Sequence, residues 1–384
     1  MSVKRIAILG STGSIGINTL KVVDHFPDQF KVEALSAYNN FKLLEKQIRK
    51  YQPRCVAVGD EGYAYLRKQF DVKKVKIYNV PKDLSLLASL TAVDIVVIGM
   101  RGFGALDPFL SAVRCGKTVA PANKEALVVA GEIIMREARK YKATIIPVDS
   151  EQSAIFQCLE GNGHNAVRRI HLTASGGALH HVPQSRFDRL SVAQILSHPR
   201  WKMGPKITVD SATLMNKGFE VIEAQRLFGL KAQQIEVVIH PQALIHSMVE
   251  FCDGSILAQL GITDMRLPIQ YALTYPRRLD TGLERLDFLK IKALTFARPD
   301  LKKFPALQLA FHVARVGGTL PCVLNAADEE AVEAFLKGKI KFSQIYKVVE
   351  KIVVNHKIVR TPTIKEIRAV DQWARQEARK IMGD

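Results

Sequence analysis

The feature that most constrains the fold is a glycine-rich loop near the start of the chain. The segment Gly10-Ser11-Thr12-Gly13-Ser14-Ile15-Gly16 follows the strand-like run KRIAIL, and the helix-like run INTLKVVDHF comes next. Glycines at such a junction let the backbone approach a pyrophosphate, and the helix N-terminus supplies amide donors. The spacing is G-x-x-G-x-x-G rather than the usual G-x-G-x-x-G, so a tight turn without a ligand is the alternative. The position of the loop favours a dinucleotide site in a Rossmann-like sheet.

Short β-branched runs alternate with amphipathic segments from residue 4 to about residue 149. The runs are KRIAILG, VEALSA, CVAVG, VDIVVIG, TVAPA and ATIIPVD. Such alternation predicts a parallel sheet covered by helices on both faces. From about residue 150 to 275 the runs VRRIHLTASGG, KITVDSA, IEVVIHP and SILAQLG predict strands in a more mixed order. From about residue 300 the apolar spacing of three and four residues predicts helices.

These patterns predict an α/β plus α protein of three domains. Residues 1–149 form an N-terminal Rossmann-like parallel sheet, and residues 150–274 form a central α/β catalytic domain. Residues 275–299, which hold Pro276 and Pro299, are expected to be a linker, and residues 300–384 a C-terminal helical bundle.

The composition limits the partners of the chain. Its net charge is +18, but the basic residues are spread along the sequence and only 7% of residues are aromatic. Nucleic-acid binding would require concentrated charge with aromatic platforms or a recognition helix, so we expect no nucleic-acid partner. An anionic substrate and an anionic cofactor explain part of the charge, and the remainder is unassigned.

The chain also lacks the signs of a membrane or secreted protein. No apolar run approaches the roughly 20 residues that span a bilayer, so no membrane partner is expected. The N-terminal residues enter a strand-like run at once, which argues against a signal peptide. Five scattered cysteines without a C-x-x-C pair suit a reducing compartment, and we therefore predict a cytoplasmic protein.

The end of the second predicted strand bears on the choice of cofactor. An NAD enzyme usually places an Asp or Glu there to bind the ribose hydroxyls. This chain has Ala34-Leu35-Ser36-Ala37-Tyr38-Asn39-Asn40, without an acid, and Lys42 follows closely. The absence of a carboxylate favours NADP over NAD.

Two acids follow the last strand-like run of the first half. In an extended chain the side chains of Asp149 and Glu151 would point the same way, and two converging carboxylates repel each other unless a cation or proton lies between them. Oxygen ligands suit Mg²⁺ or Mn²⁺. Glu220 offers a third carboxylate. A lone acid would more often be a helix cap or a surface charge, so the metal hypothesis depends on the neighbouring segments.

Two of those segments are suited to a phosphate. Thr173-Ala174-Ser175-Gly176-Gly177 ends a predicted strand with small residues, and Ser211-Ala212-Thr213-Leu214-Met215-Asn216-Lys217 offers hydroxyl, amide and ammonium donors. Short Ser/Thr runs also cap helices or form turns. Between them, the loop Ser197–Pro205 carries Trp201, which either packs on the surface or belongs to a lid. Lys124, after another strand, is expected to reach the same site.

Taken together, these segments resemble the 1-deoxy-D-xylulose 5-phosphate reductoisomerase family along essentially the whole chain. The resemblance depends on GSTGSIG (10–16), ANKEAL (122–127), PVDSE (147–151), LTASGG (172–177), HPRWKMG (198–204), VDSATLMNKGFEVIEA (209–224), IHPQALIHSMVEF (239–251) and LNAADEEAVEAF (324–335). The pair VDSAT-x-MNKG-x-E and PVDSE is the most specific part.

The resemblance implies roles for individual residues. Metal ligands would be Asp149, Glu151 and Glu220, which with Lys124 would also be catalytic. Substrate contacts would be Ser150, Glu151, Ser175, His198, Ser211, Asn216, Lys217 and Glu220, under a lid with Trp201 and Met203. NADPH contacts would be Gly10, Thr12, Gly13, Ser14, Ile15, Ala37, Asn39, Asn40, Asn123, Glu125 and Gly204.

The resemblance also implies a reaction. A sugar phosphate, 1-deoxy-D-xylulose 5-phosphate, would rearrange by retro-aldol and aldol steps to an aldehyde, and hydride from NADPH would reduce it to 2-C-methyl-D-erythritol 4-phosphate. The cation would be Mg²⁺, Mn²⁺ or Co²⁺, and the protein a homodimer. The chain departs from the family pattern at Gln152, at Ala243, in a longer segment 99–104, and in lacking a basic residue near Asn39.

Two other functions are open at this point. A semialdehyde or homoserine dehydrogenase would explain the glycine loop but not the acid beside Asn216 and Lys217. A nucleic-acid-binding protein without enzymatic activity would explain the charge, and salt-sensitive binding to duplex DNA would reveal it.

Overall fold

A computed structural model describes residues 3–162, 166–197 and 203–383. The chain divides into two compact units. Unit 1 consists of Met1–Ala126, Glu132–Ser153 and Asp264–Glu284, and unit 2 of Leu127–Gly131, Ala154–Thr263 and Arg285–Asp384. The division into three domains remains a prediction from the sequence.

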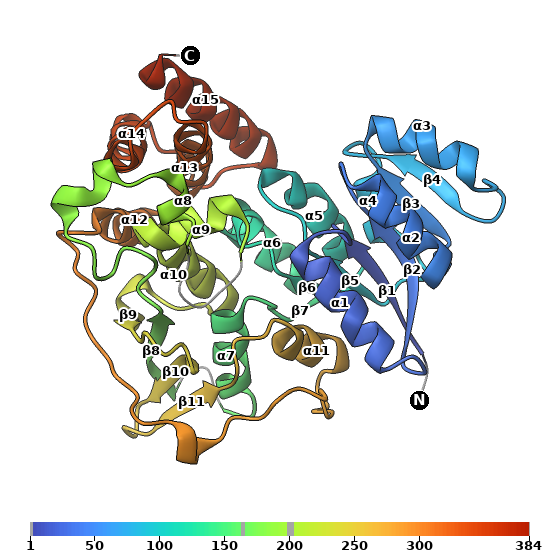
Figure 1. The fold of residues 1–384 in the computed structure, drawn as a ribbon, viewed down its shortest axis with the longest axis horizontal. Helices are drawn as coiled ribbons and strands as arrows, with labels where there is room; N and C mark the ends of the chain where they lie inside the picture. The colour runs from blue at the N-terminus through green and yellow to red at the C-terminus, as the bar shows by residue number, and fades with distance from the viewer. Residues whose placement is uncertain (1–2, 163–165, 198–202, 384) are drawn as a thin grey trace. The chain divides into compact units, whose positions relative to one another are not determined.

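Unit 1 is built around a seven-stranded sheet in which all neighbouring strands are parallel (Figure 1). The strands are β1 (Lys4–Leu9), β2 (Phe30–Ser36), β3 (Cys55–Val58), β4 (Lys76–Asn79), β5 (Ile95–Ile98), β6 (Thr118–Pro121) and β7 (Thr144–Ile145). Their order is β4-β3-β2-β1-β5-β6-β7. The direction of winding reverses between β1 and β5, and ligands of open α/β sheets bind where such neighbours end. The predicted Rossmann-like sheet is confirmed.

Helices connect the strands of this sheet. They are α1 (Ser14–His25), α2 (Phe41–Tyr51), α3 (Asp60–Gln69), α4 (Leu84–Ser89), α5 (Leu106–Arg114) and α6 (Glu125–Tyr141). The residues Ile6 to Leu9 of β1 and Val96 to Ile98 of β5 have no exposed surface. Parallel strands are buried to this extent when helices cover both faces of the sheet, which explains their continuous apolar sequences.

One helix of unit 1 comes from a much later part of the chain. Helix α11 (Arg266–Thr274) packs along α1. The ammonium of Lys4, the first residue of β1, donates hydrogen bonds to the carbonyl oxygens of Leu273 at 3.2 Å and Tyr275 at 3.3 Å, at the C-terminal end of α11. Residues 264–284 therefore pack with the N-terminal sheet as part of unit 1, although residues 154–263, which precede them in the chain, belong to unit 2.

Unit 2 contains a four-stranded sheet with the order β11-β10-β8-β9. The strands are β8 (Val167–Ala174), β9 (Ile235–Ile239), β10 (Ile245–Phe251) and β11 (Ile256–Leu260). Strands β8 and β9 are parallel, whereas β10 pairs antiparallel with both β8 and β11. The sequence predicted a mixed arrangement of strands for the central region, and three of its four predicted strands correspond to β8, β9 and β11.

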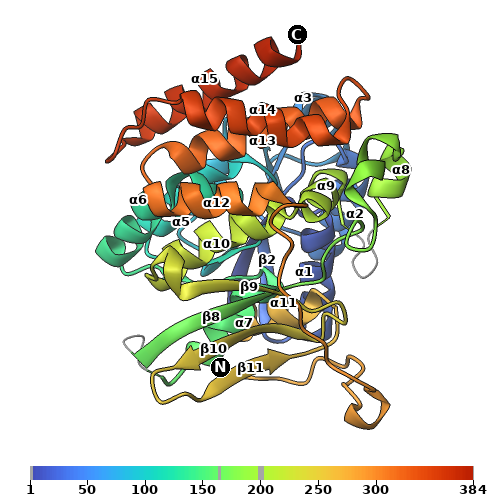
Figure 2. The ribbon, with the colours of Figure 1, turned by 90° about the vertical axis from the view of Figure 1, so that its left-hand side faces the viewer.

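The remaining main elements of unit 2 are helices. They are α7 (Ser150–Leu159), which starts in unit 1, α8 (Val192–Ile195), α9 (Pro205–Thr213), α10 (Met215–Phe228), α12 (Pro305–Val316), α13 (Leu320–Leu336), α14 (Phe342–Asn355) and α15 (Ile364–Met382). Figures 1 and 2 show α10 next to the sheet, then α12, then α13 and α14, and α15 outermost. A single apolar core joins Leu172 of β8, Phe219 of α10 and Val349 of α14.

One strand prediction in this region is wrong. The segment KITVDSA forms most of helix α9. Its β-branched residues favoured a strand, but Gly204 provides the extended N-cap and Pro205 the first helical residue, where the fixed φ of proline suits a helix. Strands β4 and β10 were not predicted.

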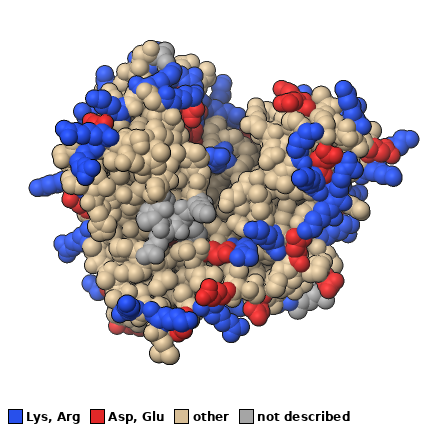
Figure 3. Space-filling model, in the orientation of Figure 1, with Lys and Arg blue, Asp and Glu red and all other residues tan. Residues whose placement is uncertain are grey.

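No helix within the described residues is long and apolar enough to cross a membrane. Figure 3 shows Lys and Arg side chains spread over the visible face, with Asp and Glu side chains among them.

Candidate active site

The glycine loop of unit 1 forms a tight turn at the switch point of the sheet. Gly10 has a φ of +86°, and a Cβ on it would lie 2.9 Å from the carbonyl carbon and oxygen of Gly99, at the end of β5. Gly16 packs directly on the backbone of Ser11. Helix α1 starts after Gly13 without a side-chain cap. The loops after β1 and β5 thus meet at an open helix N-terminus, the arrangement that binds a pyrophosphate.

The segment after β2 has no carboxylate, as the sequence indicated. Ala37 is buried, Tyr38 is exposed, and the Asn40 side chain caps α2 by accepting a hydrogen bond from the Leu43 amide at 3.2 Å. The Lys42 ammonium lies 3.6 Å from the centre of the Tyr65 ring. Lys42 is therefore held against an aromatic ring beside this segment.

The longer segment 99–104 is fixed by the buried side chain of Asn123. The Asn123 amide donates to the carbonyl oxygens of Met100 at 3.0 Å and Gly102 at 3.2 Å, and its oxygen accepts from the Ala126 amide at 2.8 Å. These three bonds give Asn123 a role in shaping the loops, which the sequence alone did not indicate. Glu125 is the first residue of α6.

Lys124 and the two acids after β7 form the charged part of unit 1. The Lys124 ammonium lies 2.6 Å from Asp149, and both side chains are largely buried. Burial raises the pKa of Asp149, the ammonium of Lys124 opposes this rise, and the carboxylate of Glu151 adds to it. The Ser150 hydroxyl donates to Glu151 at 2.5 Å.

The acids converge for a different reason than the sequence suggested. Strand β7 ends at Ile145, and Ser150 begins helix α7, so Asp149 and Glu151 do not lie on an extended chain. The prediction that strand alternation aligns them is wrong. Asp149 precedes the helix and Glu151 is in its first turn, where the positive end of the helix dipole favours carboxylates.

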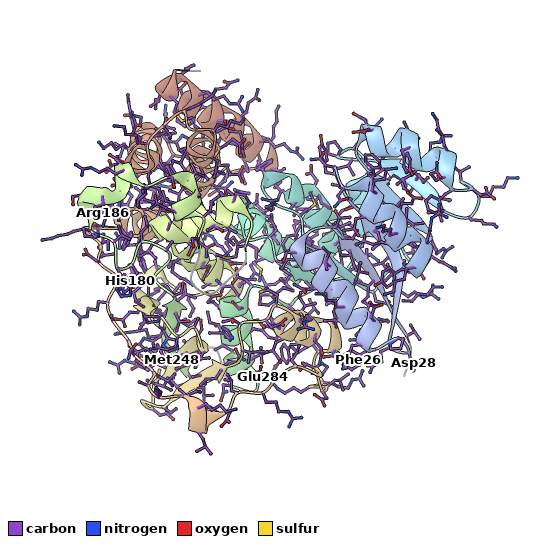
Figure 4. All side chains as sticks on the ribbon, in the orientation of Figure 1. Phe26, Asp28, His180, Arg186, Met248 and Glu284 are labelled. Atoms are coloured by element: carbon purple, nitrogen blue, oxygen red, sulfur yellow. The ribbon has the colours of Figure 1, made fainter. Side chains whose placement is uncertain are left out.

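In unit 2, the two segments predicted to bind phosphate lie next to each other. Gly177 has a φ of +70°, and a Cβ on it would clash with the carbonyl group of Ser211. The Gly177 amide donates to the Ser175 hydroxyl at 3.4 Å. The ring of His180, labelled in Figure 4, lies 2.9 Å from the position of a Cβ on Gly176. The turn after β8 therefore requires small residues, and it places Ser175 close to the end of α9.

Helix α10 carries Asn216 and Lys217 of the second segment, and the carboxylate of Glu220 lies on the same face of the helix. Leu214, with a φ of +60°, forms the sharp turn between α9 and α10. The Asn216 amide donates to Glu220 at 2.6 Å, and the buried Lys217 forms an ion pair with the same carboxylate. Gly218 lies directly against Ala310 of α12, so the glycine allows the two helices to pack closely. Thr173 instead donates to carbonyl groups of β10 and is part of the sheet.

Asp149, Glu151 and Glu220 each offer one carboxylate oxygen, and these oxygens lie within 4.8 Å of one another. Three oxygen donors at this spacing suit a hard divalent cation. Each acid also has a hydrogen-bond or ion-pair donor of its own, namely Lys124, Ser150 and Lys217. The donor set therefore fits Mg²⁺ or Mn²⁺.

Two predicted residues, His198 and Trp201, lie outside the described residues. Met203 is half-buried, and Gly204 caps α9 and accepts a hydrogen bond from the Thr208 hydroxyl at 2.9 Å.

Family profiles match three parts of the chain. They are described as 1-deoxy-D-xylulose 5-phosphate reductoisomerase (residues 6–131), its C-terminal domain (145–228) and the DXP reductoisomerase C-terminal domain (260–377). A protein of this name from Pelotomaculum thermopropionicum is 47% identical over 99% of both chains, and one from Heliobacterium modesticaldum is 49% identical over 100% of this chain and 98% of its own. The chain belongs to the 1-deoxy-D-xylulose 5-phosphate reductoisomerase family.

Solved reductoisomerase structures have the same fold. A crystal structure of DOX-P reductoisomerase in complex with NADPH, fosmidomycin and magnesium has a TM-score of 0.94 and 37% identity, and covers 99% of this chain and 98% of its own. The enzyme from Zymomonas mobilis in complex with NADPH has a TM-score of 0.93 and 39% identity over the full length of both chains. The predicted family is confirmed, and the dehydrogenase and nucleic-acid-binding alternatives are not needed.

One departure from the reductoisomerase pattern has a structural consequence. Ala243 lies in the turn between β9 and β10 with a φ of +53°, and it is buried. The ring of His240 holds this turn, because its Nε2 accepts from the Leu244 and Ile245 amides at 3.3 Å. Ala243 offers no hydroxyl to this turn.

Proposed function

We propose that the chain converts 1-deoxy-D-xylulose 5-phosphate to 2-C-methyl-D-erythritol 4-phosphate, with NADPH as reductant and a divalent cation. The observation that carries this proposal is the convergence of Asp149, Glu151 and Glu220 within 4.8 Å. Family membership over the whole chain supports it, as do the NADPH, fosmidomycin and magnesium in the complexes of related structures.

The three acids would hold the cation. When bound, a divalent cation supplies Lewis-acid stabilisation of negative charge on substrate oxygens. Lys124 and Ser150 are beside the acids and would contact the reacting end of the sugar. Glu151 and Glu220 would contact the substrate as well as the metal.

The phosphate of the substrate would be bound in unit 2. Ser175 and Ser211 provide hydroxyl groups from adjacent turns, and Asn216 and Lys217 provide an amide and an ammonium from α10. Neutral donors combined with one lysine suit a phosphate monoester. Binding energy from this remote group can hold the sugar in place for the rearrangement. Met203 would belong to the lid that the sequence predicts over it.

NADPH would lie along the switch point of unit 1. The amides of Thr12, Gly13, Ser14 and Ile15, at the start of α1, would bind its diphosphate, with Gly10 and Gly204 close to the cofactor. Ala37, Asn39 and Asn40 would contact the adenosine end, where the lack of an acid admits a 2′-phosphate. Asn123 and Glu125 would border the nicotinamide end.

We also propose that the protein is a cytoplasmic homodimer. Strand β11 is an edge of its sheet, and Ile256 and Leu257 on it are exposed. Leu289, in a short 3₁₀ turn, is 98% exposed. An exposed edge strand with apolar side chains favours association with a second copy. The five cysteines are all free thiols, which suits a reducing compartment.

The activity is tested by following NADPH oxidation with 1-deoxy-D-xylulose 5-phosphate. Turnover is expected with Mg²⁺ or Mn²⁺, loss of turnover with a chelator, recovery when the ion is restored, and inhibition by a phosphonohydroxamate. Turnover that persists unchanged in chelator would refute the metal site. Sedimentation velocity tests the dimer, and a monomer at micromolar concentration would refute it.

A further inference from the structure

Helix α9 carries an ion cluster that the proposed reaction does not use. The Lys206 ammonium lies 2.6 Å from Asp210, one turn along the same helix, and 2.9 Å from Asp328 on α13. The side chains of Asp210 and Asp328 are almost completely buried. One ammonium thus bridges two carboxyl groups inside unit 2.

The charges and hydrogen bonds of this cluster do not balance if both acids are ionised. Two carboxylates and one ammonium leave a net charge of −1 in the interior, which is strongly unfavourable. Asp210 Oδ1 and Asp328 Oδ1 also accept no hydrogen bond from any described residue, whereas Asp328 Oδ2 lies 2.9 Å from the Lys206 ammonium. A single proton on the pair would make the cluster neutral and would supply a donor for one of these oxygens.

We propose that Asp210 and Asp328 share one proton in the folded protein, and that the neutral cluster positions Ser211 for the phosphate of the substrate. This inference rests on the proposed function, because it assigns the positioning of a residue in that site. Asp210 and Asp328 are positioning residues that need not touch the substrate.

The surroundings of the pair agree with a shared proton. Burial, followed by the neighbouring carboxyl group of Asp328, raises the pKa of Asp210 well above its ordinary value, while Lys206 opposes the rise. Two carboxyl groups in one site titrate as a pair, with one proton strongly retained.

Within the described residues, the ion pairs of Asp210 and Asp328 are those with Lys206. Helices α8, α10 and α13 pack against α9. Helix α8 has no ionisable residue, and α10 places the ring of Phe219 4.6 Å from the Lys206 ammonium. Lys217 and Glu220 of α10 pair with each other, and the neighbours of Asp328 on α13, Glu329 and Glu330, pair with Arg375 of α15.

The cluster can act on Ser211 because both belong to the last turns of α9. Ser211 follows Asp210 directly, and the Thr213 hydroxyl donates to the Asp210 carbonyl at 3.1 Å. The other side of Ser211 is fixed by Gly177, which touches its carbonyl group. Loss of the shared proton would add a negative charge beside Asp210. That charge would therefore move the end of α9 relative to the turn after β8.

The direction of the pH effect follows from the retained proton. Unfolded aspartates ionise in their ordinary range, whereas burial and the neighbouring Asp328 carboxyl group raise the pKa of Asp210 in the folded protein. The stability that protonated Asp210 contributes is therefore full below the ordinary Asp range and declines as the pH rises through the raised pKa of Asp210. The KM for the sugar phosphate should rise over the same pH interval.

Infrared difference spectroscopy tests the shared proton. In the Mg²⁺–NADPH complex at neutral pH, the wild type should show a protonated carboxyl band. Asp210→Asn and Asp328→Asn should each remove this band, because the single acid that remains beside Lys206 ionises and is neutralised by the ammonium. Glu330→Gln, a matched change on α13, should retain the band. Absence of the band from the wild type, or its survival in both aspartate variants, would overturn the proposal.

Kinetics test the positioning role. Asp328→Ala should raise the KM for the sugar phosphate about tenfold, with kcat and the NADPH affinity within about twofold of wild type. Asp328→Asn should restore KM at neutral pH and abolish its rise at alkaline pH. Parallel KM profiles in the wild type and Asp328→Asn would refute the positioning of Ser211. A chain with the infrared band but no turnover would refute the proposed function instead.

Discussion

The two units provide binding groups of different kinds. In unit 1 the candidate dinucleotide site is made of backbone, since glycines at 10, 13 and 16 bring the amides of α1 to the end of β1. In unit 2 the candidate phosphate site is made of side chains, among them the buried pair of Lys217 and Glu220. A backbone site depends on sterics and tolerates few side chains, whereas a side-chain site depends on ionisation and on the packing of its helices. Variants should separate the two.

The largest effect is expected for Glu220→Gln. The change keeps the size of the side chain but removes one carboxylate from the group of three acids and the negative charge that pairs with Lys217. Turnover should fall on the order of a thousandfold or more, while NADPH affinity, measured by fluorescence titration, stays nearly unchanged. Survival of NADPH oxidation at the wild-type rate would show that Glu220 is no metal ligand.

Gly10→Ala should affect the backbone site alone. The φ of +86° and the carbonyl of Gly99 at 2.9 Å leave no room for a Cβ. We expect a loss of about 1–3 kcal/mol of unfolding free energy from backbone strain and a rise in the Kd of NADPH of at least about tenfold. Gly104→Ala is the control, because a Cβ there would meet only the end of Met100 at 3.7 Å. Equal effects of both changes would contradict the steric argument.

Gly218→Ala should give the opposite pattern in unit 2. A Cβ there would clash with Ala310 and push α10 away from α12. Overpacking of this kind costs about 1–3 kcal/mol. The KM for the sugar phosphate should rise, because Asn216, Lys217 and Glu220 move with α10, and the Kd of NADPH should stay constant. A weakened NADPH affinity would show that the two kinds of site do not separate.

Thr363→Ala should give the smallest effect. It serves as the control in unit 2 for a loss of stability that leaves the kinetics unchanged. Thr363 caps α15 by accepting a hydrogen bond from the Glu366 amide at 3.2 Å, far along the chain from every proposed site residue. Its loss should cost about 1 kcal/mol and lower Tm by a few degrees, with unchanged kinetics. Thr363→Ser keeps the hydroxyl group and should restore Tm. A change in KM would mean that α15 influences the phosphate site.

The fold could be predicted from the sequence where the backbone geometry depends on a local pattern or on a single residue type. The Rossmann-like sheet, the C-terminal helices and the turn at Gly10 follow from continuous apolar runs, periodic spacing and glycines. The strand predicted for residues 206–212 is wrong because Ile207, Thr208 and Val209 favour a strand locally, whereas the helix is decided by its start at Pro205 and by burial. For the same reason the sequence did not indicate the Lys206–Asp210 pair, whose members meet only because they are one helical turn apart.

Other parts of the site depend on tertiary structure and could not be predicted. Asp149 and Glu151 converge through the start of α7 rather than through strand alternation. Asn123 gives no local sign that it binds segment 99–104, and Asp328 meets Lys206 only because α13 packs on α9. Such contacts join residues far apart in the chain.

The late position of α11 has a consequence for biosynthesis. Because Lys4 is tied to the end of a helix that starts at Arg266, the N-terminal sheet lacks one of its covering helices until some 280 residues have left the ribosome. A fragment ending near residue 150 would expose the apolar surface of α1 that α11 normally covers. Expression of the dinucleotide-binding half by itself should therefore give an aggregating product, unless the segment 264–284 is grafted onto its C-terminus.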